Sequence, residues 1–115
     1  MPFPTAEEAM TTELPAPIQE FIDATNAGDT PRFLDVFTDD AFLSDWGREF
    51  TGIDGVGRWN QTDNIGMDST FELVAAESAG DDWTVTLTVT GNRFNGTGPL
   101  KFHLRGDKIA RLVIE

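Results

Sequence analysis

The sequence predicts an α+β domain in which three helices from the N-terminal half pack on one face of a curved, mainly antiparallel sheet. Apolar residues recur at helical spacing within residues 14–64, whereas apolar and polar residues alternate through much of residues 69–115. Helices followed by a series of hairpin-connected strands are typical of the α+β class. Helices closed over a concave sheet would leave a cone-shaped cavity, which is a natural site for a small molecule.

Length and composition are those of one globular domain. The chain has 115 residues, 39% of them hydrophobic, and we expect a single domain over residues 1–115. Residues 1–13 have little apolar periodicity, so we expect a loose arm or the start of a helix there. No apolar run approaches the roughly 20 residues of a membrane span, and the first residues lack the features of a signal peptide. We therefore expect a cytoplasmic protein with no membrane partner.

Charge and residue content exclude several classes of function. The net charge is −12, and the acidic excess lies in the first two thirds of the chain, so nucleic acid is not expected as a partner. The chain has no cysteine and one histidine, which leaves too few ligands for a zinc or iron site. The glycines of residues 52–57 lack the lysine of a phosphate-binding loop. We expect no metal and no cofactor.

Two helices are predicted at the start of the domain. Apolar residues recur at helical spacing from Ile18 to Thr25, and Gly28 in the sequence NAGD is the expected left-handed cap. A second helix is expected to begin at Thr30 and to end near residues 38–40. The apolar stripe of this second helix consists of Phe33, Leu34 and Phe37.

A hairpin and a third helix are predicted next. Residues 41–46 are expected to form a strand that turns at Gly47 and returns over residues 48–50. The third helix is expected over residues 53–64, because Ile53, Val56 and Trp59 fall on one side of it.

Four antiparallel strands are predicted for the rest of the chain. The clearest is WTVTLTVT, residues 83–90, in which large apolar residues alternate with four threonines. Turns are expected at residues 79–82, 91–98 and 106–107, of which the last is a short Gly-Asp hairpin signal. The strands are then residues 69–78, 83–90, 99–105 and 108–115. We expect the face of Thr84, Thr86, Thr88 and Thr90 to be either a dimer surface or an ordinary solvated face.

Asp45 is the candidate catalytic residue. Side chains alternate along the strand from Ala41, so Asp45 shares a face with Ala41 and Leu43 that is expected to look inward. A carboxylate placed among apolar residues at a cavity wall could take up and release a proton. The alternative is that Asp45 or Glu49 forms an ion pair with Arg48 that pins the hairpin, worth about 0–1 kcal/mol if exposed.

Other residues could complete a pocket. His103 lies on the polar phase of its strand, where it is either a surface residue or a hydrogen-bond donor at the pocket mouth. Asn60 and Asn64 lie one helical turn apart and could direct a polar strip either to the cavity or to water. The aromatic residues are either core or pocket wall. The expected ligand-binding residues are Phe21, Phe33, Phe37, Trp46, Trp59, Asn60, Phe71 and Leu100.

The stretch IQEFIDATNAGDTPRFLDVFTDDAFLSDWG, residues 18–47, resembles the opening of the nuclear-transport-factor-2-like superfamily, in particular its SnoaL-like and ketosteroid-isomerase-like members. The first helix, the NAGD cap, the second helix with its VFTDDA exit and the following strand occur in the family's order. The resemblance covers most of residues 14–115. It implies a cone-shaped α+β barrel with an interior pocket, commonly a homodimer packed through the sheet.

The resemblance allows Asp45 to be compared with the ketosteroid isomerases. Their strand ADDATVED ends in the catalytic aspartate, and TDDAFLSD here ends in Asp45, so the base position is kept. Their oxyanion hole uses a tyrosine and a protonated aspartic acid, and the corresponding positions here are Phe21 and Leu100. Loss of one such donor costs about 2.7–4 kcal/mol of transition-state stabilisation, so ketosteroid isomerase activity is not expected.

The resemblance to the SnoaL polyketide cyclases requires the fewest specific residues of this chain, because these enzymes use one aspartate as acid and base. The limonene-epoxide-hydrolase type needs an Asp–Arg–Asp set, and the scytalone-dehydratase type needs tyrosines and histidines that the chain lacks. We therefore expect a SnoaL-like small-molecule pocket protein, with cyclase, isomerase or lyase chemistry on a small hydrophobic molecule. Asp45 would be the general acid and base, assisted by Arg48 or His103. The alternative is a non-catalytic ligand-binding or dimerisation module.

Overall fold

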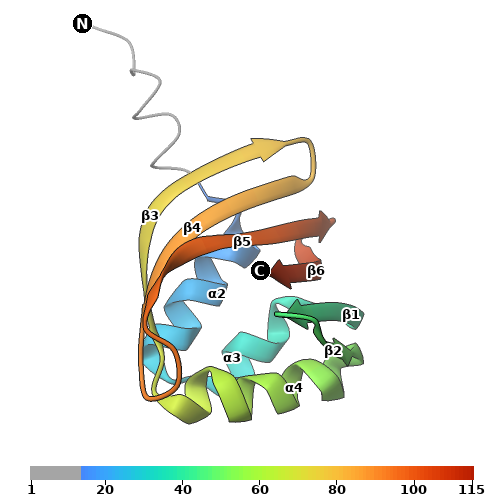
Figure 1. Ribbon diagram of the computed structural model, residues 1–115. Helices are drawn as coiled ribbons and strands as arrows, with labels where there is room; N and C mark the ends of the chain where they lie inside the picture. Colours follow the sequence, from blue (N-terminus) through green and yellow to red (C-terminus); the bar gives the residue numbers. More distant parts are fainter. Residues whose placement is uncertain (1–13) are drawn as a thin grey trace, which may run out of the picture.

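A strongly curved six-stranded sheet bends around the helices, as Figure 1 shows. The computed structural model describes residues 14–115, so the arm or helix start expected for residues 1–13 lies outside the described part of the chain. The strand order is β2-β1-β6-β5-β4-β3. The helices lie inside the curve of the sheet, and α4 runs along the side of the molecule away from the β3–β4 turn (Figure 1).

The elements follow the predicted order. The helices are α2 (Ala16–Ala27), α3 (Thr30–Asp35) and α4 (Gly52–Asp63), and a turn of 3-10 helix, η1 (Ile65–Met67), follows α4. The strands are β1 (Phe37–Asp45), β2 (Arg48–Thr51), β3 (Thr70–Ala79), β4 (Asp82–Thr90), β5 (Gly96–Arg105) and β6 (Lys108–Ile114). All neighbouring strands are antiparallel except β1 and β6, which are parallel. The predicted α+β class, with three helices on a curved, mainly antiparallel sheet, is confirmed.

The second helix is shorter than predicted. It ends at Asp35, and Phe37 begins β1 instead of extending the helix to residues 38–40. The carbonyl of Val36 accepts a hydrogen bond from the Ile109 N–H at 2.8 Å, and Phe37 pairs with Ile109 in the sheet. Because β6 satisfies these backbone groups, the chain leaves the helix early. Gly28, in contrast, caps α2 in the left-handed conformation as expected, with φ 67°.

The core is built around one phenylalanine. The ring of Phe21 on α2 lies 5.3 Å from Phe33, 6.1 Å from Phe37, 5.3 Å from Phe71 and 5.2 Å from Phe102, measured between ring centroids. These four rings meet Phe21 tilted, edge-on or stacked, and each comes from a different element, so one side chain joins α2 to α3, β1, β3 and β5. This cluster fixes how the helices sit in the curve of the sheet.

Gly55 allows α4 to approach β2 closely. A Cβ atom at Gly55 would lie 3.0 Å from the backbone carbonyl carbon of Phe50, which is closer than side chains normally pack. The first turns of α4 are therefore held against the β1–β2 hairpin. One turn later, this approach brings Trp59 and then Asp63 alongside the end of β1.

The predicted threonine face lies on the side of β4 opposite the buried residues. Val85 and Leu87 are fully buried, whereas the intervening threonines are half-buried or exposed. The expected homodimer through this face stays a prediction. None of the helices described in residues 14–115 is long and apolar enough to span a membrane.

Replacing Phe21 should test the central position of its ring. We expect Phe21→Ala to lower the free energy of unfolding by about 3–5 kcal/mol, because a fully buried ring is removed from a packed cluster. Chemical denaturation followed by circular dichroism measures this. Val74→Ala, at an exposed site on β3, is the control and should change stability by about 0.5 kcal/mol or less. Equal losses from both variants would contradict a core centred on Phe21.

Candidate functional site

A cavity of about 250 Å³ lies between α4 and the concave face of the sheet. Its wall is largely apolar and aromatic, with a few polar groups, which is the usual composition of a small-molecule site. A larger depression of about 460 Å³ lies between α3 and the starts of β1 and α4. That depression is shallow and open, so we place the candidate site in the smaller, more enclosed cavity. The side chains that carry its chemistry include Asp45, Asp63, Asn64, Trp59, Phe71 and Leu100.

Asp45 lies at the wall of this cavity, at the end of β1. Its Oδ2 accepts hydrogen bonds from Trp59 Nε1 and from Arg48 Nη2, each at 2.9 Å. The Asp45 side chain is 14% exposed. Within residues 14–115, no hydrogen bond reaches its Oδ1. The carboxylate is therefore held by one oxygen and keeps the other available to a ligand. Asp45 is thus paired with Arg48, as one of the two alternatives had it, and also lines the cavity; its role as general acid and base stays a prediction.

The β1–β2 turn places Trp46 at the mouth of the cavity. Trp46 and Gly47 form the two-residue connection between Asp45 and Arg48, and both have positive φ, 53° and 83°. Positive φ at both central positions is the requirement of a type I′ hairpin turn, and it is costly for a tryptophan. The predicted strand therefore ends one residue early, and the Trp46 side chain is 73% exposed while still lining the cavity.

Asp63, which the sequence analysis did not single out, is the most buried carboxylate of the site. Its side chain is 4% exposed. Oδ1 accepts from Arg48 Nη2 at 2.9 Å and also pairs with Arg93 Nε, and Oδ2 accepts from the Thr62 hydroxyl at 2.6 Å. Burial opposes ionisation, but the hydrogen bonds from Arg48 and Thr62 and the charges of Arg48 and Arg93 outweigh it and lower the pKa of Asp63.

Arg48 joins the two carboxylates. The hydrogen bond to Asp63, together with the nearby charge of Asp45, raises the pKa of Arg48. A guanidinium group offers five N–H donors in one plane, so it can serve both acceptors. The helical spacing of Trp59 and Asp63 could have revealed part of this arrangement, because residues four apart lie on one helix face.

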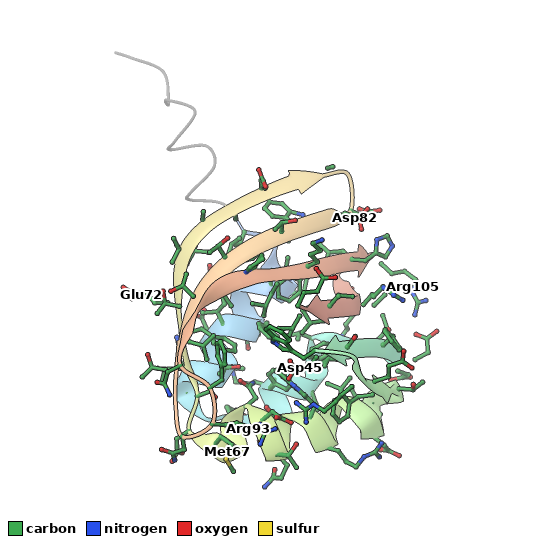
Figure 2. All side chains as sticks on the ribbon, viewed as in Figure 1. Asp45, Met67, Glu72, Asp82, Arg93 and Arg105 are labelled. Atoms are coloured by element: carbon green, nitrogen blue, oxygen red, sulfur yellow. The ribbon has the colours of Figure 1, made fainter. Side chains whose placement is uncertain are left out.

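The β4–β5 loop closes one side of the cavity. Arg93 on this loop pairs with Asp63 on α4, and Figure 2 shows Arg93 and Asp45 in the region between the sheet and α4. The Asn92 N–H donates to the Met67 carbonyl at 2.9 Å, which fastens the loop to η1. Phe94, which follows Arg93, lines the cavity although it is 49% exposed. The loop is thus held in place from two sides.

Asn60 and Asn64 form a buried polar chain at the end of α4. Asn64 Nδ2 donates to Asn60 Oδ1 and to Thr25 Oγ1, both at 3.1 Å, and Asn60 Nδ2 donates to Thr30 Oγ1 at 3.3 Å. Asn64 lines the cavity, whereas Asn60 lies behind it. Asn60 therefore ties α4 to α3 instead of meeting a ligand directly.

The structure brings together only part of the expected ligand-binding set. Trp46, Trp59, Phe71 and Leu100 line the same cavity as Asp45. The remaining aromatic residues of that set pack in the core, and one of them also borders the shallow depression. Those core residues are Phe21, Phe33 and Phe37. A residue that faces the inside of the cone can lie either in the packed core or at the cavity wall. These three residues lie in the packed core.

His103 is not brought to the cavity. Its Nδ1 is 2.8 Å from Asp82 Oδ1, and its side chain is 48% exposed. Figure 2 shows Asp82 near the β3–β4 turn, away from Asp45. The neighbours Phe102 and Leu104 point to the core, so the alternation of β5 turns His103 outward. It occupies the surface position that was one of the two alternatives. Among the residues that the structure describes, no group of three or more His, Asp or Glu could hold a metal ion.

The fold and the cavity define an NTF2-like α+β protein, with three helices against a six-stranded, mostly antiparallel sheet. More particularly, the chain belongs to the SnoaL-like domain family, whose sequence model matches residues 18–112. The resemblance drawn from residues 18–47 is thereby confirmed. None of the curated proteins matches the chain.

Solved structures support the fold. A candidate polyketide cyclase from Sinorhizobium meliloti is similar with a TM-score of 0.83 and 27% identity, over 91% of this chain and 98% of that chain. An NTF2-like protein of unknown function from Cytophaga hutchinsonii gives 0.76 and 15%, over 86% and 85%. A candidate ketosteroid isomerase from Kribbella flavida gives 0.74 and 16%, over 86% and 73%. At such low identities the last two show the fold alone.

The lowered pKa of Asp63 leads to a prediction about stability and pH. A carboxyl group with a lower pKa in the folded than in the unfolded protein stabilises the fold above its unfolded pKa of about 3.9. This contribution is lost as the pH falls through the folded pKa. We therefore expect Asp63→Asn to lower the free energy of unfolding at pH 7 by about 1–3 kcal/mol and to make the loss of stability below about pH 4 shallower.

Urea denaturation at a series of pH values measures both effects. Asp107→Asn, at an exposed site in the β5–β6 turn, is the matched control and should leave the curve nearly unchanged. A variant at Asp63 whose stability follows the wild-type pH curve would show that its ion pairs contribute nothing to folding.

Proposed function

We propose that the protein binds a small hydrophobic molecule in the cavity beside α4 and moves a proton on it with Asp45 as general acid and base. The reaction would be of the cyclase, isomerase or lyase type. The observation that carries the proposal is the geometry of Asp45, whose Oδ2 is fixed by Trp59 and Arg48 while Oδ1 stays available at an apolar wall. Positioned carboxylates of this kind contribute about 10²–10⁴-fold to proton-transfer rates.

In this proposal Asp45 Oδ1 takes a proton from an activated carbon of the bound molecule and returns it to another atom of the same molecule. The electron pair left behind is taken up by a conjugated group of the ligand, so no external oxidant or reductant is needed. Trp59 and Arg48 are positioning residues, since both act through Asp45. Similarity to a candidate polyketide cyclase at 27% identity supports this class of chemistry.

The composition of the wall argues against a ketosteroid-isomerase type of reaction. Phe21 packs in the core, and Leu100 lines the cavity without a polar group. These are the positions that correspond to the two oxyanion donors in the resemblance. A substrate that must build up a full negative charge on oxygen would receive little stabilisation from them.

The alternative function is a ligand-binding module that does no chemistry. The observation in its favour is the ion pair between Asp45 and Arg48, which occupies Oδ2 of the carboxylate and compensates its charge. The two functions differ in one measurable respect. Both bind an apolar molecule, but only the first transfers a proton through Asp45.

The base can be tested without knowing the natural substrate. 5-Nitrobenzisoxazole loses its C3 proton to a carboxylate, the N–O bond breaks, and a coloured cyanophenolate forms. We expect the protein to accelerate this reaction above the rate with an equal concentration of acetate, and Asp45→Asn to reduce the acceleration by about 10²-fold. Absorbance of the phenolate measures the rate.

Asp107→Asn serves again as the matched carboxylate control and should keep the wild-type rate. An acceleration that survives Asp45→Asn would sink the assignment of Asp45 as the base. Binding of the probe without any turnover that depends on Asp45 would favour the non-catalytic module.

A larger side chain on the sheet can be used to fill part of the cavity. Gly98 on β5 shares the inward face with Leu100, lines the cavity, and a Cβ built there meets no atom within 4 Å. We expect Gly98→Val to occupy ligand space without a clash and to weaken binding of an apolar probe such as indole by about 10-fold or more, with stability retained.

Fluorescence or calorimetric titration measures this loss, and thermal denaturation confirms that the variant is folded. Thr86→Val, on the opposite face of the neighbouring strand, is the control and should bind as the wild type does. Unchanged binding to a folded Gly98→Val variant would mean that the probe lies elsewhere.

A further inference from the structure

Most hydrogen-bond donors at the cavity wall are already used by the protein. Trp59 Nε1 donates to Asp45, and Asn64 Nδ2 donates to Asn60 and Thr25. The Ser69 hydroxyl donates to the Asp63 carbonyl at 3.4 Å. Trp46, at the mouth, keeps an indole N–H that makes no hydrogen bond within residues 14–115. A ligand that offers only acceptors therefore finds few partners inside.

Two side-chain acceptors that are largely shielded from solvent, in contrast, are left over at the cavity wall. Asp45 Oδ1 receives no hydrogen bond from the described residues, and neither does Asn64 Oδ1. Asn64 is only 1% exposed and lines the cavity. Among the described residues, Thr38 Oγ1 is the one fully buried side-chain polar atom without a partner, so the unpaired Asn64 oxygen keeps contact with open space. An acceptor without a protein partner at a largely apolar wall is a place for a donor of the ligand.

The orientation of the Asn64 amide is set by its neighbours. Asn60 Oδ1 accepts from the Ile65 N–H at 3.4 Å, so the group that Asn64 presents to Asn60 must be its NH₂. The same nitrogen, Asn64 Nδ2, also donates to the Thr25 hydroxyl oxygen at 3.1 Å. With the nitrogen occupied on both sides, the oxygen is the amide atom left for the cavity.

The charges at the wall point the same way. Among its side chains are the carboxylates of Asp45, Asp63 and Glu115, and the cavity lining contains no lysine, arginine or histidine. The guanidinium groups of Arg48 and Arg93 are paired with Asp45 and Asp63, and Lys101 is paired with Glu115. A carboxylate or phosphate on the ligand would meet no free cation here, and the net charge of −12 would repel it.

We infer that the ligand of this cavity is a flat, apolar molecule that bears an N–H or O–H donor and no carboxylate or phosphate, with Asn64 Oδ1 and Asp45 Oδ1 as its acceptors. Flat rings suit the aromatic part of the wall, formed by Trp46, Trp59, Phe71 and Phe94. This inference rests on the proposed function, because it names the substrate class of the same cavity. Asn64 would anchor the donor, and Asp45 would accept the second donor or take the proton.

Three bicyclic compounds of matched shape test the inference on the whole protein by isothermal titration calorimetry. Indole has one N–H donor, benzothiophene has the same outline without it, and indole-3-carboxylate adds a negative charge. We expect indole to bind at least 10-fold more tightly than benzothiophene, and indole-3-carboxylate to bind at least 10-fold more weakly than indole. A site built to pair a donor discriminates strongly against the analogue that lacks it.

Two variants separate the role of Asn64 from general damage to the polar chain. Asn64→Leu removes the free acceptor and should reduce the preference for indole over benzothiophene at least three-fold. Thr25→Val removes one partner of the Asn64 nitrogen behind the cavity and should leave the preference unchanged. If Asn64→Leu does not fold, the three-ligand comparison on the wild-type protein decides the inference.

The outcomes distinguish this inference from the proposed function. Equal affinities for indole and benzothiophene, or tighter binding of the carboxylate, would overturn the donor preference even if proton transfer through Asp45 is observed with 5-nitrobenzisoxazole. Failure of all three compounds to bind, together with no transfer that depends on Asp45, would overturn both. A preference for indole without proton transfer would support the inferred ligand class and overturn the role of Asp45 as general base.

Discussion

The interaction on which the site depends is the sharing of Arg48 between Asp45 and Asp63. One carboxylate ends β1 and the other ends α4, and the guanidinium group of β2 holds both at 2.9 Å. Two carboxylates at one apolar wall would repel each other without a cation between them. The shared arginine therefore permits an acidic site inside a hydrophobic cavity and also fastens the helix to the hairpin.

The contacts of Arg48 with Asp45 and Asp63 also determine how the other walls of the cavity are placed. The close approach of α4 at Gly55 sets the helix near the hairpin, and Trp59 then reaches Asp45 with its N–H. Asp63 in turn receives Arg93, which brings the β4–β5 loop and Phe94 over the opening. Packing at the phenylalanine end of the cone and ion pairing at the open end thus divide the interior into a filled part and a hollow part.

Local patterns were sufficient to predict the order of helices and strands and the face of β1 on which Asp45 lies, although not the early end of α3. Ala41 and Leu43 are fully buried, so the alternation that placed Asp45 on their face was a sound guide. The same alternation on β5 accounts for His103 facing outward. The depth of Phe21 or Phe33 within the cone could not be predicted, because inward-facing residues of the core and of the cavity share one periodicity. The pairing of Asp63 with Arg93 joins residues far apart in the chain, and neither leaves a local pattern.

The turn at Trp46 has a consequence for how the site can be observed. An exposed indole stands at the mouth of the cavity, and a buried one, Trp59, donates to the carboxylate inside it. The two differ in solvation, so their emission should differ in wavelength, while the third, Trp83, belongs to β4 and lies outside the lining. The chain therefore carries two native fluorophores at its candidate site, one exposed and one buried, and entry of a molecule can be followed optically without any label.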